Sequence, residues 1–430
     1  METTTYRRPG LVAHEHVLAV PLDHARPDGE RIELFARELV APEREHDDLP
    51  WLLYLQGGPG GRAGWPATVN GWLGRALREF RVVLLDQRGT GRSTPATRQT
   101  LPARGDAAAQ AAYLTHFRAD AIVRDAELLR RSLAGDATRW TLLGQSYGGF
   151  CVLTYLSLAP DGVREALVTG GLPALGGGPD QVYRATYRLV RERWAAYAER
   201  YPGDEGSAQE VARHLADAEE RLPSGDVLTP RRFQTIGNAL GARSRFDALH
   251  ELLEAPFTTA GRVRRLTDFF LRGVDDLVTF ARGPLYAVLH EPIYCQGEAS
   301  RWSAHRVRDE FGDEFDAGSE PFRFTGEMIY PWLFDEDPAL VPLKQTAELL
   351  AAKDDWPALY DVDRLAANTV PVAAAVYVDD MYVPFELSTR TARQVGALRP
   401  WITNTHHHDG LREDGGAILS RLLDMVRGRA

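Results

Sequence analysis

The 430-residue chain has only two cysteines, Cys151 and Cys295, which lie far apart in the sequence. A framework of several disulfide bonds is therefore excluded, and the composition favours a reducing cytoplasm as the location. No apolar run approaches the roughly 20 residues that a membrane-spanning helix needs. The opening residues, METTTYRR, contain no apolar segment, so we expect neither a secretory signal peptide nor a membrane partner.

Positive charge is also in short supply. Lysine and arginine number 50 against 60 aspartates and glutamates, a formal net charge of −10. This balance argues against nucleic acids and anionic membranes as partners. The chain has no CxxC, HExxH or EF-hand pattern, and we expect neither a metal nor a cofactor.

What the chain does have is an alternation of short apolar runs and amphipathic helices. Residues 11–22 and 31–40 alternate apolar and polar side chains around Pro27-Asp28-Gly29, which predicts an antiparallel hairpin at a sheet edge. Continuous apolar runs predict buried strands at residues 51–55, 82–85, 140–143, 166–169 and 370–378. The pattern predicts an α/β fold: a mostly parallel sheet with helices on both faces.

The pattern changes in the middle of the chain. From about residue 179 to about residue 355 the buried β runs give way to amphipathic helical stretches rich in aromatic and charged residues. We predict a core that spans residues 1–178 and 356–430, with a large, mainly helical cap at 179–355.

The motif Gly144-Gln145-Ser146-Tyr147-Gly148 stands between a predicted strand and an apolar helix that Pro160 ends. Strand, tight turn and helix form the context of a nucleophile elbow, which exposes a serine hydroxyl above the sheet. The ordinary alternative is a glycine-rich turn without chemistry. The flanking elements favour Ser146 as a nucleophile, with the Tyr147 amide as one oxyanion donor.

A second glycine-rich loop, Gln56-Gly57-Gly58-Pro59-Gly60-Gly61, follows the predicted strand at 51–55. It is not a phosphate-binding loop, because no Gly-Lys-Ser/Thr follows. A hydrolase elbow needs a second amide donor from the loop after an earlier strand, so we assign the Gly58 amide to the oxyanion hole. The loop after the next strand contains Asp86 and Arg88, which we expect to form a structural ion pair.

Acid and base candidates also follow predicted strands. Asp379 and Asp380 come after the strand at 370–378, and His406, His407 and His408 come after a strand at 401–403. Serine, aspartate and histidine in this chain order are typical of an α/β-hydrolase triad. Histidine accepts the serine proton near neutral pH, and the carboxylate orients the imidazole. Three adjacent histidines also raise the possibility of a metal site, but neighbours in sequence rarely reach one ion.

Three motifs together resemble the proline iminopeptidase (prolyl aminopeptidase) family of α/β-hydrolases, in its longer bacterial branch. They are GGPG at 57–60, DQRGTGRS at 86–93 and GQSYGG at 144–149. The family aspartate precedes Met and stands four residues before Pro, which implies Asp380. The family histidine opens the loop before the last helix, which implies His408. The chain departs from the family at Gln56, where a histidine is frequent.

The resemblance implies hydrolysis of an N-terminal residue, usually proline, from small peptides with a free N-terminus. Cap glutamates hold the substrate ammonium in the family. The candidates here are Glu291, Glu298 and Glu327, which lie among aromatic residues.

Two rival interpretations stay open. Another serine hydrolase, such as an esterase, an amidase or a peptidase of different N-terminal specificity, would have the same triad and a different cap. A non-catalytic receptor of the α/β-hydrolase fold would typically lack a triad member, whereas all three are available here.

Overall fold

The computed structural model describes residues 1–429, and its centre is a nine-stranded sheet in the order β1-β2-β3-β5-β4-β6-β7-β12-β13. The strands from β5 to β13 run parallel, whereas β1, β2 and β3 pair antiparallel at one side. Their bounds are β1 Glu2–Arg8, β2 Leu11–Pro21, β3 Arg31–Val40, β4 Trp51–Leu55, β5 Arg81–Leu85, β6 Trp140–Gln145, β7 Val163–Thr169, β12 Val372–Tyr377 and β13 Leu398–Thr403. The predicted α/β fold is confirmed.

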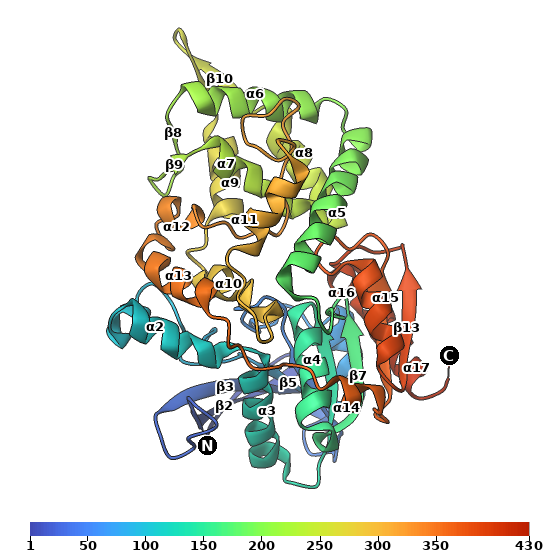
Figure 1. Cartoon of the computed structure of the whole chain (residues 1–430). Helices are drawn as coiled ribbons and strands as arrows, with labels where there is room; N and C mark the ends of the chain where they lie inside the picture. The colour runs from blue at the N-terminus through green and yellow to red at the C-terminus, as the bar shows by residue number, and fades with distance from the viewer. Residues whose placement is uncertain (430) are drawn as a thin grey trace.

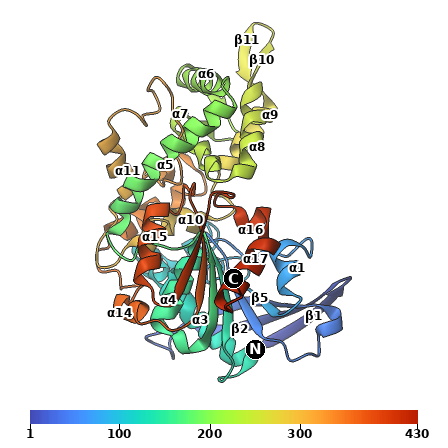
Figure 2. The same cartoon turned by 90° about the vertical axis from the view of Figure 1, so that its right-hand side faces the viewer.

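Helices cover both faces of the sheet, as Figure 2 shows. One face carries α1 (Gly71–Ala76) and α17 (Gly415–Val426), and α16 (Gly410–Glu413) lies beside them. The other face carries α3 (Ala119–Ala134), α4 (Tyr147–Leu158), α14 (Val362–Ala366) and α15 (Phe385–Gln394). Successive strand residues point to opposite faces, so Leu142 packs with the second group and Leu143 with the first. This double burial explains why these strands are apolar throughout.

The segment between β7 and β12 adds no strand to this sheet and forms a helical layer above it (Figure 1). Its helices are α5 Gly178–Arg200, α6 Asp204–Asp217, α7 Pro230–Gln234, α8 Phe246–Glu254, α9 Asp268–Val278, α10 Pro284–Leu289, α11 Ser303–Arg308, α12 Leu333–Glu336 and α13 Lys344–Ala352. Two small hairpins, β8 (Glu220–Arg221) with β9 (Val227–Leu228) and β10 (Phe257–Ala260) with β11 (Val263–Leu266), interrupt the helices. The domain boundaries at 178/179 and 355/356 stay a prediction.

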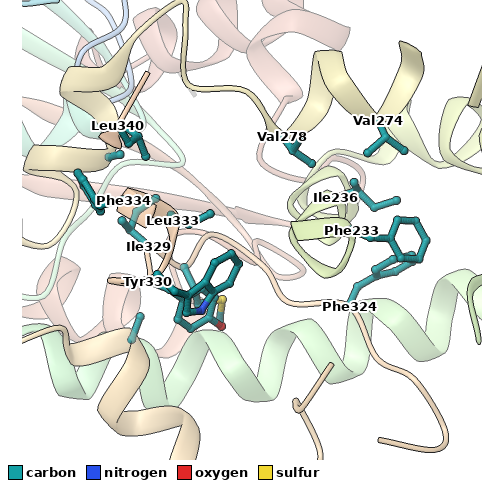
Figure 3. Packing of buried hydrophobic residues seen from close by; sticks show 14 of the residues in the cluster. Phe233, Ile236, Val274, Val278, Phe324, Ile329, Tyr330, Leu333, Phe334 and Leu340 are labelled. Carbon is teal, nitrogen blue, oxygen red and sulfur yellow. The ribbon is translucent and has the colours of Figure 1, made fainter. Parts of the chain in front are cut away.

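The interior of the cap is apolar (Figure 3), and its cluster of buried side chains continues into α2 of the core. The rings of Phe233 and Phe324 meet edge to face with centroids 5.3 Å apart, and Val274 and Val278 of α9 belong to the same cluster. The cap rests on the core partly through α13, which contacts α2 (Ala107–Leu114). The cap is therefore a packed layer of helices above the sheet. In residues 1–429, no helix is both long enough and apolar enough to cross a bilayer.

Two details differ from the predictions. The edge strand is β1, outside the predicted hairpin; its ETTTYRR sequence is almost wholly exposed and so lacks an apolar signal. The predicted Asp86–Arg88 ion pair is wrong. The Arg88 guanidinium donates to both carboxylate oxygens of Asp125 in α3, at 2.6 and 2.7 Å, while Asp86 accepts the backbone amides of Ala63 and Arg92.

Candidate active site

Ser146 occupies the sharp turn between β6 and α4. Its backbone has φ 55° and ψ −126°, a conformation that residues other than glycine rarely adopt. The turn brings α4 so close to β4 that a Cβ atom at Gly148 would collide with the carbonyl oxygen of Leu55. The backbone around Ser146 therefore has the strand, sharp turn and helix of the elbow that the sequence predicts.

Asp380 and His408 meet beyond the ends of β12 and β13. The Nδ1 atom of His408 donates to Oδ2 of Asp380 at 2.8 Å. The other carboxylate oxygen, Oδ1, accepts the backbone amides of Tyr382 and Val383, both at 2.9 Å. Because a carboxylate is an acceptor, Nδ1 carries the proton and Nε2 is left as the basic atom.

The surroundings of His408 set its basicity. Burial disfavours the imidazolium, but the charge and hydrogen bond of Asp380, together with the charges of Glu327 and Asp409, raise the pKa of His408 above its ordinary value. The Tyr382 ring meets the imidazole edge to face, with centroids 4.7 Å apart. The imidazole therefore binds a proton more tightly than an ordinary histidine does.

The neighbouring candidates point elsewhere. Asp379 pairs with Arg193 of the cap, with its Oδ1 3.0 Å from the arginine Nη2. His406 Nδ1 lies 2.9 Å from Glu413, and His407 Nε2 lies 3.4 Å from Arg193 Nη1. Of the two adjacent aspartates and the three adjacent histidines, only Asp380 and His408 contact each other. The three histidine side chains each have a different partner.

A cavity of about 660 Å³ lies between the cap and the carboxyl ends of the strands. Ser146 and His408 line it from the core, and Glu327 and Tyr286 line it from the cap. Gly58 lines the same cavity, in a backbone conformation with φ 143° where an added Cβ would lie 2.8 Å from the amides of Gly60 and Gly61. Within residues 1–429, neither the Gly58 amide nor the Tyr147 amide donates to another protein group. Neither amide is therefore occupied by a protein acceptor among these residues.

Glu327 is the cap glutamate that reaches the cavity. Its side chain is 18% exposed, and the Tyr286 hydroxyl donates to its Oε1. Burial raises the pKa of Glu327 to about 7. The nearest basic side chain is His290, 3.9 Å away, and burial lowers the pKa of that imidazole to about 4, so it is neutral. No arginine or lysine among the described residues forms an ion pair with Glu327.

The other two predicted glutamates do not line the cavity. Glu291 is 3% exposed, and its carboxylate accepts the amides of Ser303 and Ala304 at the start of α11, at 3.0 and 2.9 Å. Glu298 is exposed and lies against Gly178 at the start of α5. The first is engaged in capping a helix and the second faces solvent, so the geometry leaves both without access to a substrate in this cavity.

Sequence reasoning missed several cavity residues. Gln145, next to Ser146, places its Nε2 3.4 Å from Nε2 of His408. Tyr382 and Tyr286 present aromatic surface. The position of Tyr382 directly after Asp380-Met381 is a usable signal, but nothing in the local sequence of α10 singles out Tyr286.

Comparison with known proteins agrees with this architecture. Residues 50–272 match the family model described as the alpha/beta hydrolase fold. A proline iminopeptidase of Aeromonas sobria is 49% identical over 98% of this chain and 98% of its own length. The proline iminopeptidase aneH of Aspergillus aculeatus is 36% identical over 95% and 92%. A solved structure, the proline iminopeptidase of Mycobacterium smegmatis, is 15% identical with a TM-score of 0.43, over 96% of this chain and 100% of that one. The chain belongs to the proline iminopeptidase family of α/β-hydrolases.

Proposed function

We propose that the enzyme is a serine aminopeptidase that releases an N-terminal residue, preferably proline, from small peptides with a free N-terminus. The observation that carries this proposal is a single cavity with Ser146 and His408 on its core side and Glu327 on its cap side. The two halves of the chemistry, acyl transfer and recognition of an ammonium group, thus face the same space.

Acylation begins when Nε2 of His408 takes the proton of Ser146 and the serine Oγ attacks the carbonyl carbon of the first residue. The amides of Gly58 and Tyr147 bind the oxyanion that develops. His408 then passes the proton to the nitrogen of the leaving peptide. Asp380, fixed by three hydrogen bonds, stabilises the imidazolium without taking its proton. Water repeats the sequence and releases the free amino acid.

Selectivity for a free N-terminus comes from Glu327. A substrate ammonium loses its hydration on entering the cavity, and a carboxylate without a cationic protein partner compensates for that loss. Tyr286 and Tyr382 line the same cavity and offer apolar faces for a pyrrolidine ring. An acylated N-terminus has no charge for Glu327 to bind and adds bulk at the same point.

The proposal also covers the domain division and the location of the enzyme. We assign residues 1–178 and 356–430 to the catalytic core and 179–355 to the cap that selects the substrate. We also assign the enzyme to the cytoplasm, since both cysteines are free and buried and no disulfide stabilises the fold.

The test compares prolyl arylamide with its N-acylated counterpart and with simple acyl esters. We expect cleavage of the free substrate and none of the blocked one. Equal cleavage of both would refute aminopeptidase action and leave an esterase or amidase as the better assignment. A fluorophosphonate probe tests the triad separately, because failure of Ser146 to react would favour the non-catalytic receptor.

A further inference from the structure

Arg193 of α5 links the cap to the core at one point. Its Nη2 lies 3.0 Å from Oδ1 of Asp379, and its Nη1 lies 3.4 Å from Nε2 of His407. The arginine side chain is 13% exposed, so the contact is largely shielded from water. One guanidinium of the cap therefore contacts two separate core loops.

Those two loops are the ones that contain the acid and base candidates. Asp379 directly precedes Asp380 after β12, and His407 directly precedes His408 after β13. A shift of either neighbour moves the backbone from which a triad side chain extends. Arg193 itself does not line the cavity, so it has no direct contact with the substrate.

The contact to His407 suits a neutral imidazole. The ring is buried, and the edge of Phe246 in α8 packs against it with centroids 6.0 Å apart. Burial and the positive charges of Arg193 and Arg243 lower the pKa of His407, and the charges of Asp379 and Asp409 only partly oppose them. At neutral pH the unprotonated Nε2 can accept a hydrogen bond from the guanidinium.

We propose that Arg193 is a positioning residue through which the cap holds the aspartate loop and the histidine loop in the register that aligns Asp380 with His408. The inference rests on the proposed triad of Ser146, Asp380 and His408. It assigns the cap a second role besides choosing the substrate: the cap helix α5 takes part in building the catalytic geometry of the core.

The experiment compares Arg193→Gln with Arg191→Gln. Arg191 is the matched control: it lies on the same helix, and its ion pair with Glu314 stays within the cap. For each variant we would measure kcat and KM on prolyl arylamide, the rate at which Ser146 reacts with a small fluorophosphonate, and Tm. Arg193→Lys keeps the charge opposite Asp379 but lacks the fork that reaches His407 as well.

Loss of Arg193 should lower kcat and the fluorophosphonate rate together, by roughly 10- to 100-fold, because both need an aligned triad. KM should stay within about twofold, since the ammonium site is untouched. The unpaired Asp379 carboxylate adds to the negative charges of Asp380, Glu327 and Asp409 around His408, so the acid limb of kcat/KM should move to higher pH. Arg193→Lys should recover part of kcat, and Arg191→Gln should match wild type in kcat, in KM and in the fluorophosphonate rate.

Wild-type kcat and labelling in Arg193→Gln, with or without a lowered Tm, would overturn the inference and leave Arg193 as an ordinary interface contact. An equal loss in Arg191→Gln would overturn it too, because the effect would then belong to the helix in general. Failure of the triad itself is distinguishable: wild-type enzyme would then not react with the probe at all.

Discussion

His408 and Asp380, 28 positions apart in the chain, are joined by a hydrogen bond of 2.8 Å from Nδ1 to Oδ2. Asp380 cannot turn away from this bond, since its other oxygen is held by the amides of Tyr382 and Val383. The carboxylate is 1% exposed and acts as an acceptor throughout. This arrangement selects one imidazole tautomer and leaves Nε2 as the base.

Substitution of the proposed triad should abolish turnover while leaving the fold intact. We expect Ser146→Ala, Asp380→Asn and His408→Ala to lower kcat by about four to six orders of magnitude, the usual cost of losing a triad member. Steady-state kinetics on prolyl arylamide, with circular dichroism as a check on folding, measures this.

The adjacent residues serve as controls for that series. Asp379→Asn, His406→Ala and His407→Ala should lose no more than about 100-fold, as expected for groups that act only through position. An inactive Asp379→Asn variant together with an active Asp380→Asn variant would identify Asp379, and not Asp380, as the aspartate of the triad. A Ser146→Ala variant that keeps a tenth of wild-type kcat would remove the nucleophile assignment.

Glu327→Gln should damage recognition of the free N-terminus. Loss of a desolvated charge partner costs about 2–5 kcal/mol, so kcat/KM for free prolyl arylamide should fall by that equivalent. The rate at which Ser146 reacts with a neutral fluorophosphonate should change far less, because that step requires only the triad and the oxyanion hole.

Two other glutamates act as controls for Glu327. Glu298→Gln, at an exposed position, should behave like wild type. Glu291→Ala should lower the free energy of unfolding by about 1–2 kcal/mol, because two amides of α11 lose their acceptor, with no change in preference for free over blocked substrate. A loss of that preference in Glu291→Ala but not in Glu327→Gln would reverse the assignment.

Activity should fall on the acid side of neutrality for two reasons. The pKa of Glu327 is about 7, raised by burial, so below that pH the carboxyl is protonated and cannot pair with an ammonium. The pKa of His408 is also raised above its ordinary value, so protonation of the imidazole at falling pH removes the base and adds a second loss. The pH profile of kcat/KM for the free substrate should contain both losses, and that of the fluorophosphonate reaction only the second.

Glu327→Gln separates the two losses. The variant should lose the part of the profile due to the carboxyl. The acid limb of its fluorophosphonate reaction should move to lower pH, because a negative charge that raises the pKa of His408 is gone. An acid limb at unchanged pH would show that the charge of Glu327 does not raise the pKa of His408.

Chelators should leave activity unchanged. Among residues 1–429, no cluster of three or more histidine, cysteine, aspartate or glutamate side chains is placed to hold an ion. Activity after dialysis against EDTA, compared with buffer alone, is the measurement. Inhibition that zinc or manganese reverses would contradict the metal-free mechanism.

Much of the core could be predicted because its signals are local. Buried parallel strands read as continuous apolar runs, and the elbow needs small residues within five positions of each other. Strand β1 escaped prediction because it is exposed on both faces and has no apolar pattern. The ion-pair partner of Arg88 was also not predicted, because the choice between Asp86 and Asp125 depends on how α3 packs against the sheet.

The sequence by itself determined the buried strands of the core and the elbow at Ser146, because each of these signals depends on residues close together in the chain. Only the tertiary structure decided which cap glutamate faces the cavity. Glu291 and Glu327 have similar aromatic neighbours in sequence, yet one caps α11 and the other lines the cavity above Ser146. That difference arises from how the cap helices pack, since long-range packing, rather than local sequence, decides which carboxylate finds a protein partner and which is left for a ligand.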